Sequence, residues 1–256
     1  MSRVIGKGEE GDHLRLDSEK VSKFFERRAA RIPELGATRA VIYQDRHPDL
    51  AEKRDAYERR VLTPRLELDG SQRLLDVGCG TGRWTSTISS KVASYHGIDF
   101  APGLVEHAAA EHGQPPRVRF SVADASDFSL DSLGEHEPFD RVLVSGVFIY
   151  LNDDGLDSAL RCIAGATVDG ALVLLREPVA QGDRLTLVDH HSEELDADYH
   201  AVYRTRAELL GAIEAAGGVP GFTLRGHGYV YDDPDLNNRR ETQQEWFLLS
   251  TGTGAA

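Results

Sequence analysis

Residues 73–84 read Arg-Leu-Leu-Asp-Val-Gly-Cys-Gly-Thr-Gly-Arg-Trp, an apolar run that leads into a turn with glycine at every second position. Glycine has no Cβ, so this turn can adopt strained dihedral angles and let a ligand touch the backbone. A dinucleotide fingerprint would place its third glycine one residue later, and a phosphate loop would continue with Lys and then Ser or Thr. The stretch therefore predicts a strand followed by a turn that suits a nucleoside ligand without a pyrophosphate.

Three further stretches, residues 94–99, 118–125 and 139–147, are apolar runs that end in acidic or small residues. The first ends in Asp99, 17 residues beyond Gly82. A carboxylate at such a strand end can accept hydrogen bonds from the hydroxyl groups of a ribose. Strands that alternate with helices at this spacing predict a parallel sheet with helices on both faces.

Together these stretches resemble the motifs of the class I S-adenosylmethionine-dependent methyltransferases. The matching segments are DVGCGTG at 76–82, GID at 97–99, ADA at 123–125 and FDRVLVSGVFIYL at 139–151. The resemblance extends from about residue 55 to about residue 250. It implies an α/β fold with a Rossmann-like seven-stranded sheet, an antiparallel C-terminal hairpin and an N-terminal helical cap. It also implies S-adenosyl-L-methionine as the cofactor.

The resemblance further assigns residues to the parts of the cofactor. The glycine turn would pass under the methionine half, Asp76 would hold the amino group through the loop or a water molecule, and Asp99 would bind the ribose. Asp124 and the Ala125 backbone would meet the adenine amino group, Phe100 would cover the ring, and the residues after the fourth strand would flank the sulfonium. The expected cofactor-binding set is Asp76, Gly78, Cys79, Gly80, Gly82, Asp99, Phe100, Asp124, Ala125, Ser145, Gly146 and Val147.

The chain divides into three parts by composition. Residues 1–17 are polar and contain glycine, which predicts a flexible N-terminus. Residues 18–66 carry two helical patterns and predict a helical cap, with Asp17 or Ser18 as the first N-cap. Residues 67–256 form the expected core, with a substrate-covering insertion at about 177–204.

Within the core, several elements follow from local patterns. A helix is expected at 81–92 after the glycine turn, and the apolar run 171–176 predicts a central strand covered on both faces. Thr205 is the expected cap of a helix that ends at Gly217. The polar connection at 232–242 predicts that the last two strands pair as an antiparallel hairpin.

Composition excludes several classes of function. The net charge of −13 argues against a nucleic-acid partner, which would need clustered Lys and Arg. The chain contains no apolar run long enough to cross a membrane and begins with no secretion signal. Its 2 cysteines predict neither a disulfide framework nor a metal cluster, and we expect a cytoplasmic protein without a bound metal.

The candidate catalytic residues lie in the insertion. A general base is needed only if the acceptor must lose a proton, and the candidates are His190, His191, His200 and Tyr203. Aromatic residues would line the acceptor pocket, although about half of them could equally belong to an ordinary core. The expected substrate-binding set is Phe24, Phe25, Tyr43, Phe148, Tyr150 and Tyr199.

The expected function is methyl transfer to nitrogen or oxygen of a small organic molecule in specialised (natural-product) metabolism. Alternatives are transfer to carbon, transfer to a protein side chain, and a protein that binds the cofactor to sense it or to catalyse another rearrangement. The cap helix at 18–32 is expected to cover the ligand crevice, so deletion of residues 1–32 should slow turnover. The same helix could also pair across a homo-oligomer.

Overall fold

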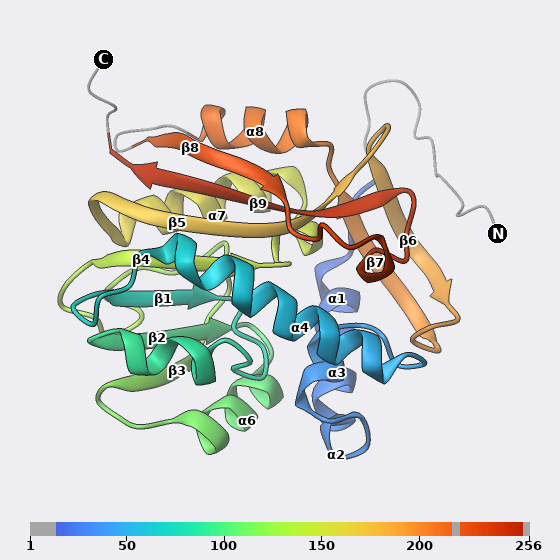
Figure 1. Ribbon diagram of the computed structural model, residues 1–256, viewed down its shortest axis with the longest axis horizontal. Helices are drawn as coiled ribbons and strands as arrows, with labels where there is room; N and C mark the ends of the chain where they lie inside the picture. The colour runs from blue at the N-terminus through green and yellow to red at the C-terminus, as the bar shows by residue number, and fades with distance from the viewer. Residues whose placement is uncertain (1–13, 217–220, 253–256) are drawn as a thin grey trace.

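The computed structural model describes residues 14–216 and 221–252. Its centre is a seven-stranded sheet in the order β3-β2-β1-β4-β5-β9-β8, and β6 and β7 form a separate antiparallel pair (Figure 1). Strands β1 to β5 pair in parallel, and β9 pairs antiparallel with both β5 and β8. The strands are β1 Arg73–Val77, β2 Ser94–Asp99, β3 Val118–Val122, β4 Phe139–Ser145, β5 Thr167–Ala180, β6 Leu185–Ser192, β7 Ala197–Tyr203, β8 Phe222–Tyr229 and β9 Thr242–Thr251. The predicted fold class, including the antiparallel C-terminal hairpin, is confirmed.

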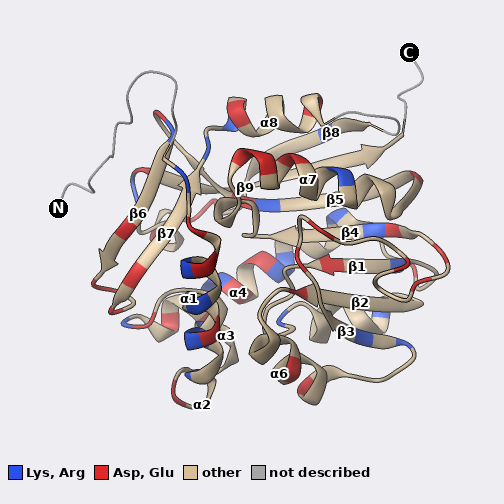
Figure 2. Ribbon diagram, turned by 180° about the vertical axis from the view of Figure 1, so that it is seen from behind, with Lys and Arg blue, Asp and Glu red and all other residues tan. Residues whose placement is uncertain are grey.

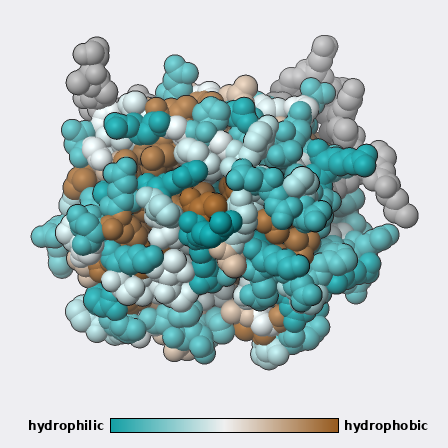
Figure 3. Space-filling model, in the orientation of Figure 1, coloured by the Kyte–Doolittle hydropathy of each residue, from teal (hydrophilic) through white to brown (hydrophobic). Residues whose placement is uncertain are grey.

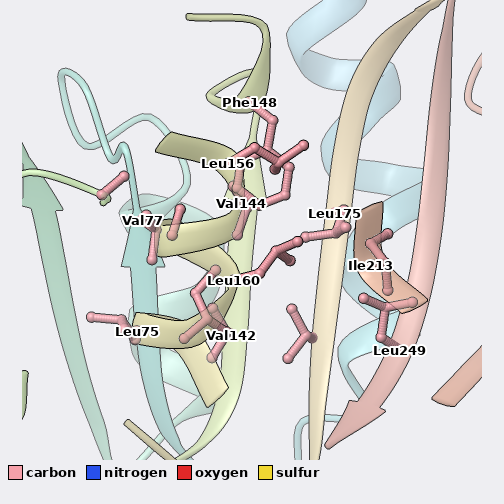
Figure 4. Close-up of a cluster of buried hydrophobic side chains, with 14 of the residues drawn as sticks. Leu75, Val77, Val142, Val144, Phe148, Leu156, Leu160, Leu175, Ile213 and Leu249 are labelled. Carbon is pink, nitrogen blue, oxygen red and sulfur yellow. The ribbon is translucent and has the colours of Figure 1, made fainter. Parts of the chain in front are cut away.

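The middle strands are apolar because both of their faces are covered. In β1, Leu74, Leu75 and Val77 are fully buried, and the predicted central strand is the middle of β5. One face packs against α7 and α8, where Leu160 and Ile213 meet side chains from β4, β5 and β9 (Figure 4). A parallel sheet sandwiched in this way exposes only its strand ends as a place for a ligand.

Helices lie on both faces of the sheet and at its carboxyl edge. α4 packs against β5 through η1 on the face opposite α7, and α6 lies beside β2 and β3. The α-helices are α1 Ser18–Ala30, α2 Ile32–Leu35, α3 Ala37–Val41, α4 Pro48–Leu62, α5 Thr85–Ile88, α6 Pro102–His112, α7 Asp153–Gly165 and α8 Arg206–Ala215. The 3-10 helices are η1 Thr63–Leu66, η2 Ser89–Lys91, η3 Phe148–Tyr150 and η4 Pro234–Leu236.

A cap layer stands at the edge where the parallel strands end (Figure 1). It consists of α1, α2, α3 and the β6–β7 pair, and its apolar side chains form a cluster of their own around Phe24, Phe25 and Leu187. The side chain of Asp17 caps α1 by accepting from the Glu19 and Lys20 amides, as predicted. Ionic contacts also hold this layer together, because the buried Arg28 of α1 pairs with Asp45 at 2.6 Å.

Two local predictions were wrong. The helix expected at 81–92 is only α5, followed by the 3-10 turn η2, because its Ser- and Thr-rich sequence competes with helical hydrogen bonding. Residues 229–231, whose sequence Tyr-Val-Tyr predicts a short strand of their own, do not form one: β8 runs to Tyr229, and Val230 and Tyr231 lie buried after it. By contrast, Thr205 caps α8 in a full capping box, as predicted. Residues 1–13 and Gly217 lie outside the described residues.

The surface is predominantly polar. Charges of both signs lie along α1 and α4 (Figure 2), and the face seen in Figure 3 shows separate apolar patches among hydrophilic side chains. Among the described helices, none combines the length and the apolar character that a membrane span needs.

Candidate active site

Two adjoining cavities open at the carboxyl edge of the parallel strands. They share Phe25, Gly78, Asp99, Gly146 and Tyr150 as wall residues. One extends toward β2 and β3, and the other toward β5, β9 and the β6–β7 pair. This edge is the crevice in which open α/β sheets bind ligands.

The cavity toward β2 and β3, here called the nucleoside cavity, gathers most residues assigned to the ribose and adenine. Helix α1 covers it through Ser18 and Val21. The Oδ1 atom of Asp124 accepts from the Ser126 amide and hydroxyl, both at 2.7 Å, which fixes the carboxylate at the cavity wall. The predicted residues that line it are Gly78, Asp99, Phe100, Asp124, Ala125, Gly146 and Val147.

Asp99 is held in place by two backbone amides. Its Oδ2 accepts from Gly80 N at 2.9 Å and its Oδ1 from Ala101 N at 3.0 Å. Burial raises the pKa of Asp99 to about 6, because the two amide hydrogen bonds offset only part of the desolvation of its charge. A partly desolvated carboxylate at this position is a strong acceptor for hydroxyl donors.

The glycine turn brings the backbone into close contact with the residues that follow β4. At Gly78, φ is +70° and an added Cβ would lie 2.2 Å from the Cγ2 atom of Val147. An added Cβ at Gly80 would meet Val41 of α3 at 2.8 Å, so the cap rests directly on the turn. Cys79 lines the second cavity beside Gly78 and Gly80.

Two residues assigned to the cofactor lie outside both cavities. An added Cβ at Gly82 would lie 2.7 Å from His112 of α6, so this glycine allows the helix to approach the turn. Asp76 is fully buried behind the turn, its Oδ2 accepts from the Tyr95 hydroxyl, and burial raises its pKa to about 7. The structure therefore places Gly82 and Asp76 where they shape the turn from behind.

A buried carboxylate also fixes the loop after β4. Glu177, near the end of β5, accepts from Val147 N at 2.9 Å and from Phe148 N at 3.1 Å. This pairing holds Ser145 and Gly146 at the wall of the second cavity. Phe148, expected to bind substrate, instead points into the core between the sheet and α7 and is 1% exposed (Figure 4).

The second cavity, here called the acceptor cavity, has an aromatic end. Four residues of the expected substrate-binding set line this end: Phe25, Tyr43, Tyr150 and Tyr199. The candidate catalytic residue Tyr203 lines it as well. Phe24 does not line the cavity and packs behind Tyr43 and Tyr199. The hydroxyls of Tyr150 and Tyr199 are 3.0 Å apart, and Tyr203 donates to Tyr199 at 3.3 Å. Burial raises the pKa of Tyr150 and of Tyr199 well above the usual range, so these phenols are neutral donors.

A β-bulge decides which candidate histidine reaches the acceptor cavity. The register of β6 shifts between Leu187 and His190, and Asp189 between them has φ of +49°. In a regular strand, residues three apart would face opposite sides, but with the bulge Leu187 and His190 both line the cavity. The His191 side chain is 58% exposed, and that of His200 is buried and accepts from Asp189 N at 3.2 Å. His190 and Tyr203 are thus the candidate catalytic residues that the cavity brings together.

The opposite end of the acceptor cavity is rich in arginine, which the sequence analysis missed. Glu58 of α4, which is fully buried, is the carboxylate that joins several of these side chains. Glu58 pairs with Arg83 at 2.7 Å and with Arg176, and accepts from the Tyr231 hydroxyl at 2.5 Å. Neighbouring arginines lower the pKa of Glu58 to about 2 against the effect of its burial. The arginines that line this end are Arg54, Arg83, Arg176 and Arg239.

A signal for this cluster was present in the sequence. Arg54, Asp55 and Glu58 lie at helical spacing on one face of α4, between the buried residues Ala51 and Leu62. A charged helix is usually read as a solvated face. Among the described residues, no group of three or more His, Cys, Asp or Glu side chains could hold a metal ion.

The chain resembles methyltransferases in sequence. A family model described as a methyltransferase domain matches residues 74–170. A 23S rRNA (uracil(1939)-C(5))-methyltransferase of Mannheimia succiniciproducens is 33% identical over 31% of this chain and 18% of that protein. The aklanonic acid methyltransferase of a Streptomyces species is 36% identical over 32% of this chain and 38% of that protein. The chain thus spans less than half the length of these curated relatives.

Solved structures share the fold over nearly the whole chain. Phosphoethanolamine N-methyltransferase 1 of Haemonchus contortus, in complex with phosphoethanolamine and S-adenosylhomocysteine, superposes with a TM-score of 0.70 at 16% identity. The match covers 94% of this chain and 51% of that one. Residues 74–170 of the chain thus match a methyltransferase domain, and the whole described sheet shares the fold of these solved structures.

Proposed function

We propose that the protein transfers a methyl group from S-adenosylmethionine to nitrogen or oxygen of a small organic molecule in specialised metabolism. The observation that carries this proposal is the pair of cavities that meet at Gly78 and Gly146. One has the acidic and small residues that suit a nucleoside. The other has an aromatic end and an arginine-rich end that suit an acceptor.

The residues present fit the cofactor. Asp99 offers a desolvated carboxylate to a ribose, and the Asp124 side chain and Ala125 stand where the adenine edge would lie. The close contact at Gly78 leaves no room for a side chain, so the backbone itself can border the methionine chain. The cofactor, when bound, supplies a methyl group that is already electrophilic.

The protein's own contribution is to orient the acceptor and exclude water. Because the methyl group needs no further activation, the rate depends on alignment of the acceptor's lone pair in a dry cavity. Helix α1 borders both cavities and the β6–β7 pair borders the acceptor cavity, so these elements would exclude water. Neutral Tyr150 and Tyr199 can donate hydrogen bonds to the acceptor, and His190 can accept its proton when that proton must leave.

Several observations support a small acceptor. The acceptor cavity lies beneath the cap layer. The relatives named for aklanonic acid and phosphoethanolamine are named for small acceptors, which supports a small organic substrate. The relative named for ribosomal RNA matches over 18% of its length, and the −13 charge here disfavours a nucleic-acid partner. We place the reaction in the cytoplasm as part of this proposal, since Cys79 and Cys162 are free thiols.

Two measurements test the proposal. Calorimetry should show saturable binding of S-adenosylmethionine and S-adenosylhomocysteine to the purified protein. Incubation with a labelled methyl donor and a cell extract, separated by size, should place the label in the small-molecule fraction. Label in the protein fraction would favour a protein methyltransferase, and a methylated carbon in the isolated product would favour C-methylation. Absence of binding of both ligands would contradict the whole proposal.

A further inference from the structure

Arg54 is a buried cation without a carboxylate partner among the described residues. It is 7% exposed and lines the acceptor cavity. Its Nε donates to the carbonyl oxygen of Leu236 at 2.7 Å and its Nη2 to the Asn238 side-chain oxygen at 2.8 Å. Both acceptors are neutral, so they satisfy its hydrogen bonds without cancelling its charge. A buried charge of this kind usually has a counter-ion.

The carboxylates in the neighbouring ion pairs bind other arginines, and Glu58 and Glu194 attract Arg54 only from beyond ion-pair distance. Arg59 and Arg83 both pair with Asp55, and Arg83 and Arg176 both pair with Glu58. Three arginines thus share two carboxylates, and Arg54 adds one more cation. The cofactor would not correct this surplus, because its ammonium and sulfonium groups outnumber its single carboxylate.

The order of the strands places the partners of Arg54 away from the nucleoside cavity. Asp99 ends β2, Gly78 follows β1, Ser145 ends β4, and Arg176 lies on β5. Neighbouring strands are about 4.8 Å apart, so Arg176 lies roughly 14 Å along the sheet from Asp99. The partners of Arg54 belong to the connection that leads into β9, one strand farther. Arg83 and Arg176 therefore reach back to the residues that border the methyl group, since Arg83 donates to the Ser145 hydroxyl at 3.0 Å, whereas the partners of Arg54 lie beyond those strands.

From this arrangement, and resting on the proposed function, we infer that the methyl acceptor is a small organic anion. Its carboxylate or phosphate group binds at Arg54, and its body extends toward the tyrosines, where the nucleophilic atom meets the methyl group. Arg54 thereby selects the acceptor by charge. Gln44 supports Arg54 through Asn238, whose amide donates to the Gln44 oxygen at 2.9 Å.

The test uses matched probes on the intact protein. Benzoate, phenyl phosphate and neutral benzamide are titrated by calorimetry into protein saturated with S-adenosylhomocysteine, which occupies the cofactor's own carboxylate site. We expect at least one anionic probe to bind tenfold or more tightly than benzamide, and the stronger of the two distinguishes carboxylate from phosphate. The variant Arg54→Gln should lose this preference, Arg54→Lys should keep part of it, and each should bind S-adenosylhomocysteine as the unaltered protein does.

A matched control and clear contrary results complete the test. Arg161→Gln removes an arginine from the exposed face of α7 and should change nothing. Equal binding of the three probes, or no saturable binding of either anion, would overturn the inference. A tenfold loss of S-adenosylhomocysteine affinity in Arg54→Gln would also overturn it, because Arg54 would then hold the cofactor. If the unaltered protein does not bind S-adenosylhomocysteine, the proposed function fails, and the same titrations of the ligand-free protein still test the anion site.

Discussion

Burial determines the chemistry of individual residues at this site. Asp99 stays a carboxylate at neutral pH although burial raises its pKa to about 6, because two amides stabilise its charge. Between pH 3.8 and about 6 the folded chain retains a proton that the unfolded chain releases. Asp99 therefore lowers the stability of the ligand-free fold as the pH rises through this window, and a bound ribose would recover part of that cost.

We predict that cofactor affinity depends on the ionisation of Asp99. The affinity for S-adenosylhomocysteine should fall below pH 6 as the carboxylate is protonated, by up to about tenfold per pH unit. Asp99→Asn should weaken binding by roughly 10- to 100-fold, because charge-assisted hydrogen bonds contribute about 1.5–3 kcal/mol. It should also remove this pH dependence. Calorimetry from pH 5 to 8 measures both effects, and unaltered affinity in Asp99→Asn would refute the ribose assignment.

We also predict that His190 acts in turnover and His191 does not. With an acceptor that must lose a proton, His190→Gln should lower kcat by about 10²-fold or more while S-adenosylhomocysteine affinity stays unchanged. The matched control is His191→Gln, because the His191 side chain is 58% exposed. Equal kcat values for the two variants would eliminate His190 as the base.

At the scale of elements, buried ion pairs join α4 to the sheet. Glu58 connects the helix to Arg83 after the glycine turn and to Arg176 of β5. The arginines lower its folded pKa to about 2. The stability that this carboxylate contributes is therefore present above its unfolded pKa of 4.5 and is lost as the pH falls toward 2.

Loss of this one charge should destabilise the fold. Glu58→Gln leaves two buried arginines without their shared counter-ion, and we expect the free energy of unfolding to fall by about 3–5 kcal/mol. Glu52→Gln, on the exposed face of the same helix, is the control and should change it by less than about 0.5 kcal/mol. Urea denaturation at pH 7 measures both. A Glu58→Gln protein as stable as the control would show that Glu58 is not needed to join α4 to the sheet.

Elements could be predicted where the pattern was regular. The helix cap at Thr205 and the apolar strand β5 follow from local sequence. The β6–β7 pair could not be predicted from local sequence, because the bulge between Leu187 and His190 interrupts the alternation of apolar and polar residues that marks a strand. The arginine-rich end of the acceptor cavity could not be assembled either, since Arg54 and Arg176 are 122 residues apart and meet only in the folded chain.

At the scale of the whole molecule, the buried apolar side chains form three clusters, and the cap has a cluster of its own. Two of them pack on the faces of the sheet, and the third unites α1 with the β6–β7 pair. The sequence predicted the sheet because each strand end carried its own motif. It also predicted that α1 covers the ligand crevice, but not the contacts that hold α1 there, such as Phe25 with Tyr150, at 4.9 Å between ring centroids.

This separation leads to a prediction for the intact domain. Deletion of residues 1–32 removes α1, whose Val21 and Phe25 line the nucleoside cavity, but leaves both sheet-face clusters complete. We expect a cooperatively folded protein whose turnover is reduced by at least about tenfold, or roughly 1.4 kcal/mol of transition-state stabilisation. Circular dichroism with thermal unfolding checks the fold, and a methyl-transfer assay checks the rate. Normal turnover by a folded truncated protein would show that α1 does not act as a cover.

The reversed direction of β9 bears on how the substrate preference of this protein could change. Because β9 is antiparallel to β5, its first residues, Thr242 and Gln244, lie at the same edge as the ends of the parallel strands. The connection before it, which contains Asn238 and Arg239, therefore borders the acceptor rather than the far side of the sheet. Insertions and exchanges in this connection can alter which acceptor fits while the cofactor half of the molecule is inherited unchanged. It is accordingly a natural place to graft a new substrate preference.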